Sequence, residues 1–185
     1  MSRKTTLLVA AFVCGVLVAC ASTQSRTEII KPTTLHDDQK SNSGAVPDGY
    51  AIETAFERVV VLRFKFDTDL LLGIEREVKK LAIQDAVILS AIGSVRGYHV
   101  HSVSNRTFPS KNIFVKDPVA SADIVGMNGY VIGGRVHAHV VLANPDHAFG
   151  GHLEPETRVF TFAVVTLGVL REPVDLSRVD DKTYR

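Results

Sequence analysis

The sequence contains no apolar run long enough to form a membrane-spanning helix, and no dense cluster of basic residues. Its uncharged amino-terminal stretch, residues 7–20, is shorter than the roughly 20 residues that a helix needs to cross a hydrocarbon core of about 30 Å. A permanent transmembrane helix is therefore not expected. The whole chain has 21 basic and 20 acidic residues, whereas nucleic-acid binders normally carry a basic face that neutralises phosphates. Charge therefore makes DNA a poor candidate partner.

Cysteine is also scarce, because only Cys14 and Cys20 are present and both lie in the apolar stretch. Arg3 and Lys4 precede this stretch, which is the layout of a signal peptide. The stretch ends in Leu17-Val18-Ala19-Cys20, which resembles the bacterial lipobox, where the cysteine sulfur carries a diacylglycerol. The alternative is an ordinary secretory signal with a cysteine at this position by chance.

An acylated Cys20 predicts a membrane anchor, since several acyl chains hold stably where one alone holds only marginally. Cys14 would leave with the signal, so no internal disulfide is expected even in an oxidising compartment. Without Arg3 and Lys4 the mature chain has 19 basic and 20 acidic residues, a formal charge of −1. An Asp beside the lipidated cysteine would indicate retention in the inner membrane, but residues 21 and 22 are Ala and Ser. We therefore expect the outer membrane of the bacterial cell envelope.

Composition divides the chain into four segments. Residues 1–19 are predicted to be the signal, and residues 20–50 the lipidated cysteine with a flexible tether, because residues 22–48 are largely polar. A tether of this length has a root-mean-square reach of roughly 30 Å. Residues 51–173 are expected to form one globular domain, followed by a tail over residues 174–185.

The domain is predicted to be α+β, with a mainly antiparallel sheet and few flanking helices. Asp67, Thr68 and Asp69 offer N-cap side chains, and Leu71, Ile74, Val78 and Leu81 follow at helical spacing. The remaining apolar or alternating segments are separated by Gly, Pro, Asn or Asp and indicate strands. These strands are expected over residues 58–66, 86–92, 98–103, 122–126, 130–132, 135–143 and 158–170.

Histidines are concentrated after the middle of the chain. His137 and His139 alternate with apolar residues, so in a strand their side chains lie on one side, about 6.5–7 Å apart along the chain. Gly150 and Gly151 precede His152 and allow the backbone to bring a third imidazole towards the pair. Three neutral imidazoles with an open fourth position suit Zn²⁺ or a similar divalent transition metal. Histidines that merely line a strand face or satisfy hydrogen bonds at a subunit boundary are the alternative.

His99 and His101 show the same alternation. They are candidates either for ligands of this site or for a second metal site. His147 lies in Asn144-Pro145-Asp146-His147, which predicts a turn.

These motifs carry a family resemblance. Residues 86–97, the His137-Ala138-His139 triplet and Gly150-Gly151-His152-Leu153 resemble the plant and prokaryote conserved (PPC) domain over about residues 54 to 171. This domain occurs in plant AT-hook proteins and in prokaryotic proteins labelled as DNA-binding. The resemblance implies an antiparallel α+β fold, a homotrimer with sites near subunit boundaries, and a metal-binding cluster of His137, His139 and His152.

Two departures limit what the resemblance implies. Prokaryotic relatives usually carry a Glu in the strand after Gly-Gly-His-Leu, whereas residues 160–165 contain no acid. If that Glu orients a ligand or holds a proton, its role is vacant at that position. Plant relatives also carry basic AT-hook segments that enter the DNA minor groove, and this chain has none.

Three functions are consistent with the sequence. The favoured one is a trimeric, metal-binding module that recognises a small ligand or an envelope protein without catalysis. The second is a metal-dependent enzyme, with Glu154 or Asp146 as proton acceptor, although no motif identifies catalytic residues. The third is a nucleic-acid binder, which requires four basic residues to converge on one face of a trimer: Arg106, Lys111, Lys116 and Arg135.

Overall fold

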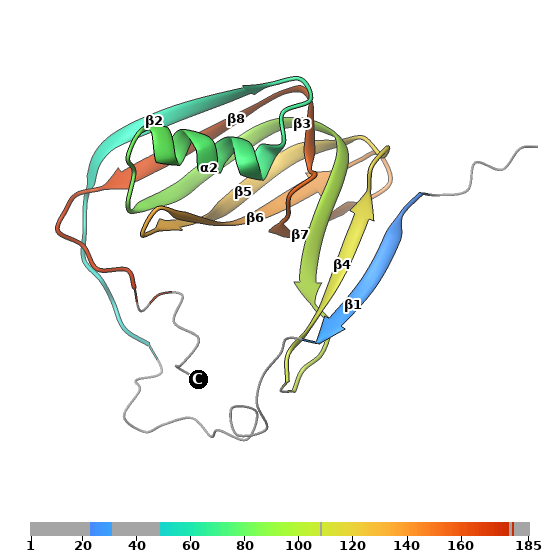
Figure 1. Cartoon of the computed structure of the whole chain (residues 1–185), viewed down its shortest axis with the longest axis horizontal. Helices are drawn as coiled ribbons and strands as arrows, with labels where there is room; N and C mark the ends of the chain where they lie inside the picture. Colours follow the sequence, from blue (N-terminus) through green and yellow to red (C-terminus); the bar gives the residue numbers. More distant parts are fainter. Residues whose placement is uncertain (1–22, 31–48, 108, 178, 180–185) are drawn as a thin grey trace, which may run out of the picture.

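The computed structural model describes residues 23–30, 49–107, 109–177 and 179. These residues form an eight-stranded sheet with antiparallel pairing and one α-helix (Figure 1). The predicted α+β class with a mainly antiparallel sheet is therefore confirmed. None of the helical segments described is long and apolar enough to cross a membrane. The elements are β1 (Ser25–Ile30), β2 (Phe56–Lys65), α2 (Leu70–Lys80), β3 (Ala86–Val103), β4 (Lys111–Asp117), β5 (Ala122–Ile132), β6 (Arg135–Ala143), β7 (Ala148–Leu153) and β8 (Arg158–Leu170).

Strand β3 organises the sheet because it is long enough to pair with four other strands. Its first part lies between β8 and β5, and its last part lies between β7 and β4. Strands β5, β6 and β7 pair successively, so β7 returns to β3 and these four strands close on one another. Strand β2 extends the sheet beside β8, and β1 extends it beside β4.

Helix α2 packs against the core side of this sheet. The Asp69 carboxylate accepts a hydrogen bond from the Leu72 backbone N–H at 3.2 Å, which caps the helix as predicted. Leu71, Ile74 and Val78 are buried, but Leu81 is 40% exposed, so the predicted apolar row does not extend that far. The helix ends at Lys80, and Leu81 therefore leaves the helical face that contacts the core.

Strands β3 and β5 are each continuous where two shorter strands were predicted. Glycines suggested breaks, but at Gly93 and Gly129 they permit close backbone approach instead. Gly129 has φ +143°, and a Cβ there would lie 2.0 Å from the His137 carbonyl oxygen. Gly93 has φ +139°, and a Cβ would lie 2.1 Å from the Phe162 carbonyl oxygen. Only glycine accommodates both conditions, so the strands run on through these positions.

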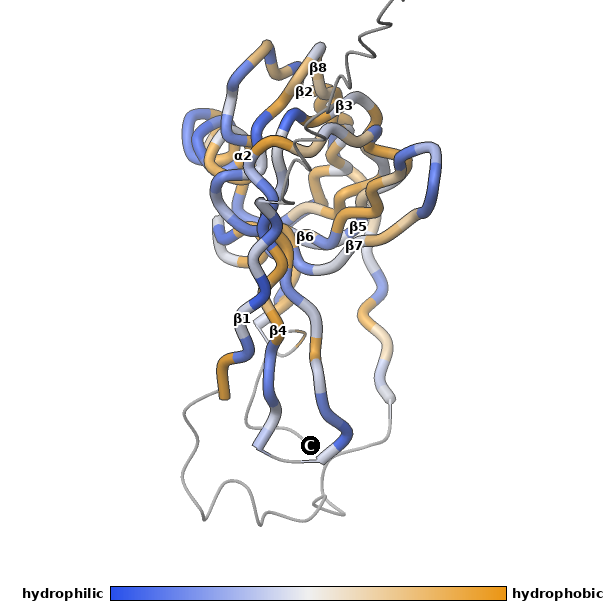
Figure 2. Tube along the Cα trace, turned by 90° about the vertical axis from the view of Figure 1, so that its right-hand side faces the viewer, coloured by the Kyte–Doolittle hydropathy of each residue, from blue (hydrophilic) through white to orange (hydrophobic). Residues whose placement is uncertain are grey.

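Strand β1 corrects part of the predicted tether. Its six residues pair in register with residues 111–116 of β4. Figure 2 shows β1 and β4 extending away from the body of the domain; we call β1, β4 and residues 98–103 of β3 the arm. Every β1 residue is exposed, so the segment lacks the buried alternation by which a strand is recognised. Cys20, the predicted signal and the rest of the predicted tether lie outside the described residues.

Candidate metal site

The candidate site lies on the sheet face that points away from the core. In β6, Ala138, Val140 and Leu142 are buried, and the alternation places His137 and His139 on the opposite face. His139 is paired with His152 across β6 and β7, and His152 is paired with His101 across β7 and β3. Directly opposed residues in antiparallel strands share a face. The sheet register therefore places three imidazoles in a row and His137 beside them.

The four rings form one contiguous cluster. The Nε2 atoms of His137 and His139 are 3.3 Å apart. The ring centroid of His152 lies 4.9 Å from that of His137, 5.4 Å from that of His139 and 4.5 Å from that of His101. We call His101, His137, His139 and His152 the histidine cluster.

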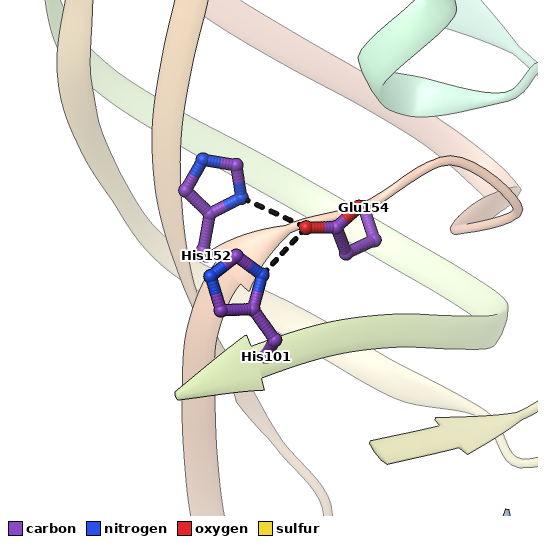
Figure 3. A group of neighbouring side chains, drawn as sticks. All are labelled: His101, His152 and Glu154. Atoms are coloured by element: carbon purple, nitrogen blue, oxygen red, sulfur yellow. Dashed lines mark hydrogen bonds and ion pairs between the residues drawn. The ribbon is translucent and has the colours of Figure 1, made fainter. Parts of the chain in front are cut away.

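Glu154 joins the histidine cluster to a carboxylate. Its Oε1 atom lies 2.6 Å from Nδ1 of His101 and 3.2 Å from Nδ1 of His152 (Figure 3). The contact with His101 has the length of a short hydrogen bond. His101, His152 and Glu154 each offer a ligand atom within 4.8 Å of the others, which makes them a candidate metal-binding group.

One nitrogen in this group has an unmet bonding requirement. The Nδ1 atom of His152 is buried and makes no hydrogen bond, although the Oε1 atom of Glu154 lies 3.2 Å away. A buried nitrogen without a partner is costly. A metal ion bound at this lone pair would satisfy it, so the arrangement fits a cation.

The local environment favours the neutral form of two imidazoles, those of His139 and His152. Burial lowers the pKa of His152 below its ordinary value, His101 lowers it further, and Glu154 offsets part of the effect. Partial burial among the neighbouring rings also lowers the pKa of His139, with contributions from His137 and His101. A neutral imidazole has a free lone pair for a metal. Protons therefore compete weakly for these nitrogens near neutral pH.

Comparison with known proteins assigns the domain. Residues 51–171 match the model of the Plants and Prokaryotes Conserved (PCC) domain. The chain belongs to this family. This is the family introduced above as the plant and prokaryote conserved (PPC) domain, so the resemblance seen in the histidine and glycine motifs is confirmed. A search of curated proteins found no match for the chain.

Solved structures agree with the PCC fold. A metal-containing protein from Archaeoglobus fulgidus is 24% identical with a TM-score of 0.56, over 65% of this chain and 86% of that one. A plant- and prokaryote-conserved protein from Pyrococcus horikoshii is 24% identical with a TM-score of 0.54, over 69% and 89%. A hypothetical protein from Salmonella is 18% identical with a TM-score of 0.56, over 69% and 92%. At these identities the likeness establishes the fold alone.

The PCC domain brings some predicted site residues together and separates others. The predicted ligands His137, His139 and His152 have adjoining rings, but of these three only His152 belongs to the candidate metal-binding group, whose other members are His101 and Glu154. His99 does not: its Nδ1 lies 3.0 Å from the Pro155 carbonyl oxygen, and it is not a member of the candidate metal-binding group. His99 and His101 therefore do not form a separate paired site in the described structure.

The loop histidine and its neighbouring acid lie in a turn. The Asn144 side-chain oxygen accepts hydrogen bonds from the backbone N–H groups of Asp146 and His147, each at 3.0 Å. His147 packs on Phe149, with ring centroids 5.3 Å apart. Neither Asp146 nor His147 belongs to the candidate metal-binding group.

From the sequence, Glu154 is predicted only as a possible proton acceptor of a metal-dependent enzyme, and not as a neighbour of the histidines. The available signal was its spacing, because Glu154 follows His152 by two residues and so projects to the same side if the extended backbone continues. The family's carboxylate in the following strand is absent, yet Glu154 places a carboxylate against two imidazoles.

Proposed function

We propose that this chain is a lipid-anchored envelope protein whose PCC domain binds a divalent transition metal, with Zn²⁺ the leading candidate. The ion serves to recognise a small ligand or a protein partner, without catalysis. The observation that carries the proposal is the histidine cluster with Glu154 beside it, in which the buried Nδ1 of His152 makes no hydrogen bond.

The donor set favours a transition metal over Mg²⁺ or Ca²⁺. The latter ions prefer oxygen ligands, whereas imidazoles with one carboxylate suit Zn²⁺ and its neighbours. In a tetrahedral zinc site with bonds of about 2.0–2.1 Å, neighbouring ligand nitrogens are about 3.3–3.4 Å apart. The 3.3 Å separation of the His137 and His139 Nε2 atoms is compatible with that geometry.

Glu154 supports the site in one of two ways. It would be a direct ligand beside His101 and His152, or it would accept a hydrogen bond from His101 and orient that ring. Metal-binding histidines commonly donate their second ring N–H to a carboxylate. In both cases the chain supplies more nitrogen donors than a three-ligand site needs.

Metal content tests the proposal. The full-length protein would be purified in detergent without chelator or nickel affinity resin, and its metals measured by mass spectrometry. About one ion per chain is expected, and a His137→Ala, His139→Ala double variant should lose it. His147→Ala is the matched control, since that histidine lies in the β6–β7 turn outside the histidine cluster. Absence of metal from both the parent protein and the control would refute the proposal.

The anchor and the assembly are further parts of the proposal. A Cys20→Ser variant should lose the acylated mature mass and the membrane association of the parent.

We expect a homotrimer, and the exposure of Tyr130 and Val141 near the histidine cluster supports self-association through this face. Analytical ultracentrifugation in detergent would measure the assembly, and a monomer at micromolar concentration would contradict it. Outer-membrane placement is tested by membrane fractionation.

A metal-dependent enzyme is the second candidate, and the position of Glu154 favours it. A carboxylate beside imidazoles is a suitable proton acceptor. The two readings separate on turnover. The enzyme should show an activity that is abolished by chelator and by His139→Ala, whereas the binding protein should lose metal with no turnover to lose.

Nucleic-acid binding receives little support from the described basic residues. Lys111 lies 3.8 Å from Glu28, and Lys116 pairs closely with Glu156. Two of the four cations required for a DNA-binding face are therefore partly neutralised. Duplex DNA affinity that falls steeply with salt would be needed to restore this function.

A further inference from the structure

Strand β1 leaves very little chain between the proposed lipid anchor and the folded domain. Thr23 is the first described residue, and only residues 21 and 22 separate it from Cys20. Because one residue spans at most about 3.6 Å, the Cα atoms of Cys20 and Thr23 are no more than about 11 Å apart. A flexible tether with a reach of roughly 30 Å therefore does not separate this end of the domain from the membrane.

Residues 23 and 24, at the start of the described chain, are held against the arm by side-chain hydrogen bonds as well as by the pairing of β1 with β4. The Thr23 hydroxyl donates to Oδ1 of Asp117 at 3.1 Å, and the Gln24 amide donates to the Tyr98 hydroxyl at 3.0 Å. Asp117 and Tyr98 are both buried. The position of residue 23 relative to the domain is therefore set by contacts with the folded core.

A strongly exposed apolar side chain lies next to this point. The Asp117 Oδ1 atom that accepts from Thr23 also accepts the backbone N–H groups of Val119 at 3.1 Å and Ala120 at 3.0 Å. Val119 is 70% exposed, more than any other large hydrophobic side chain of the described residues. The shared oxygen thus holds the Val119 turn beside the start of the described chain.

A cation lies on the same short strand. Arg26 is exposed and makes no ion pair with a described acid, in contrast to Lys111 and Lys116 of β4. It lines a small cleft of about 190 Å³ together with Gln24 and Tyr98, and His101 of the histidine cluster borders the same cleft. An exposed guanidinium close to a lipid anchor is suited to pair with phosphate oxygens.

We infer that the Thr23 end of the arm faces the membrane, with the phospholipid headgroup layer as its binding partner. Val119 enters the boundary between headgroups and acyl chains, and Arg26 pairs with lipid phosphate. This orientation rests on the lipid anchor of the proposed function and does not require a bound metal. It gives the domain a fixed side towards the bilayer instead of free rotation on a long tether.

Site-specific fluorescence quenching tests the orientation in the full, processed protein. The acylated Cys20 has no free thiol and Cys14 leaves with the signal, so Val119→Cys supplies one reactive thiol. The labelled protein would be reconstituted into vesicles of phosphatidylethanolamine and phosphatidylglycerol that contain a nitroxide-labelled lipid. Matched controls are Val103→Cys at the far end of β3, 63% exposed, and Leu72→Cys on α2, 45% exposed.

Quenching at Val119→Cys should exceed quenching at both controls several-fold. Adding Arg26→Glu to Val119→Cys should reduce the quenching more than adding Arg63→Glu, because Arg63 is an exposed residue of β2, outside the arm. Equal quenching at the three positions, or stronger quenching at Leu72→Cys, would overturn the orientation. The mass of the amino-terminal peptide separates the two proposals. An acylated peptide with uniform quenching removes only the orientation, whereas a peptide without acyl groups removes the anchor and the orientation together.

Discussion

The imidazole of His101 stacks on that of His152, with ring centroids 4.5 Å apart. The two rings come from β3 and β7, which are distant in the chain but directly paired at these residues. The contact makes His101 part of the cluster formed by β6 and β7. The Glu154 carboxylate lies close to both stacked rings, near the Nδ1 atom of His101 and the Nδ1 atom of His152. His101 is consequently the residue through which β3 contributes to the candidate metal-binding group.

Replacing His101 by Ala should therefore remove or strongly weaken the bound metal. His99→Ala is the matched control, because His99 lies on the same strand but has its Nδ1 at the Pro155 carbonyl. We expect metal content to fall in the first variant and stay unchanged in the second. Equal metal content in the two variants would exclude His101 from the site.

Removing only the charge of Glu154 should lower metal affinity. Glu154→Gln keeps the size of the side chain but weakens its contacts with His101 and His152, so a decrease of about 10–100-fold is expected. Competition with a chromophoric chelator would measure the affinity. Glu156→Gln, two residues later and paired with Lys116 at the surface, should retain the parent affinity. A loss of the same size in both variants would indicate a general charge effect.

The stability of the metal-free protein should depend on pH through His139 and His152. Both have folded-state pKa values below 6.5, so the unfolded chain takes up protons first as the pH falls through about 6.5. The free energy of unfolding should therefore decrease on acidification below that pH, with no contribution from these groups well above it. Urea unfolding of chelator-treated protein between pH 8 and 5 would measure the slope.

A His139→Gln, His152→Gln variant serves as the control for this dependence. It should show a shallower decrease than the parent over the same pH range, because neither replacement binds protons. A variant with the full parental slope would show that other groups cause the effect.

Gly129 should be intolerant of a side chain, in contrast to Gly126 on the same strand. Gly129→Ala places a Cβ against the His137 carbonyl oxygen at a positive φ. We expect the free energy of unfolding to fall by about 1–3 kcal/mol. A Cβ at Gly126 meets no heavy atom within 4 Å, so Gly126→Ala should change stability by no more than about 0.5 kcal/mol. Thermal unfolding of both variants measures the difference, and similar melting temperatures would contradict this account of β5.

Local sequence pattern determined several features of this protein. The alternation of His137 and His139 placed both on one strand face, and the spacing of Leu71, Ile74 and Val78 after Asp69 predicted the capped helix. The histidine and glycine motifs identified the family, and the segments between turn residues gave the antiparallel α+β class. Each depends on residues close in the chain, whose relative positions follow from helix or strand geometry.

Tertiary structure alone decided which distant residues meet. His99 and His101 have equivalent local patterns, and only the register of β3 with β7 selects His101. Likewise β1 has no buried side chain of its own, and its strand forms because β4 offers a free edge to pair with. Strand pairing between remote segments is fixed by the whole sheet and its core, so no local period encodes it.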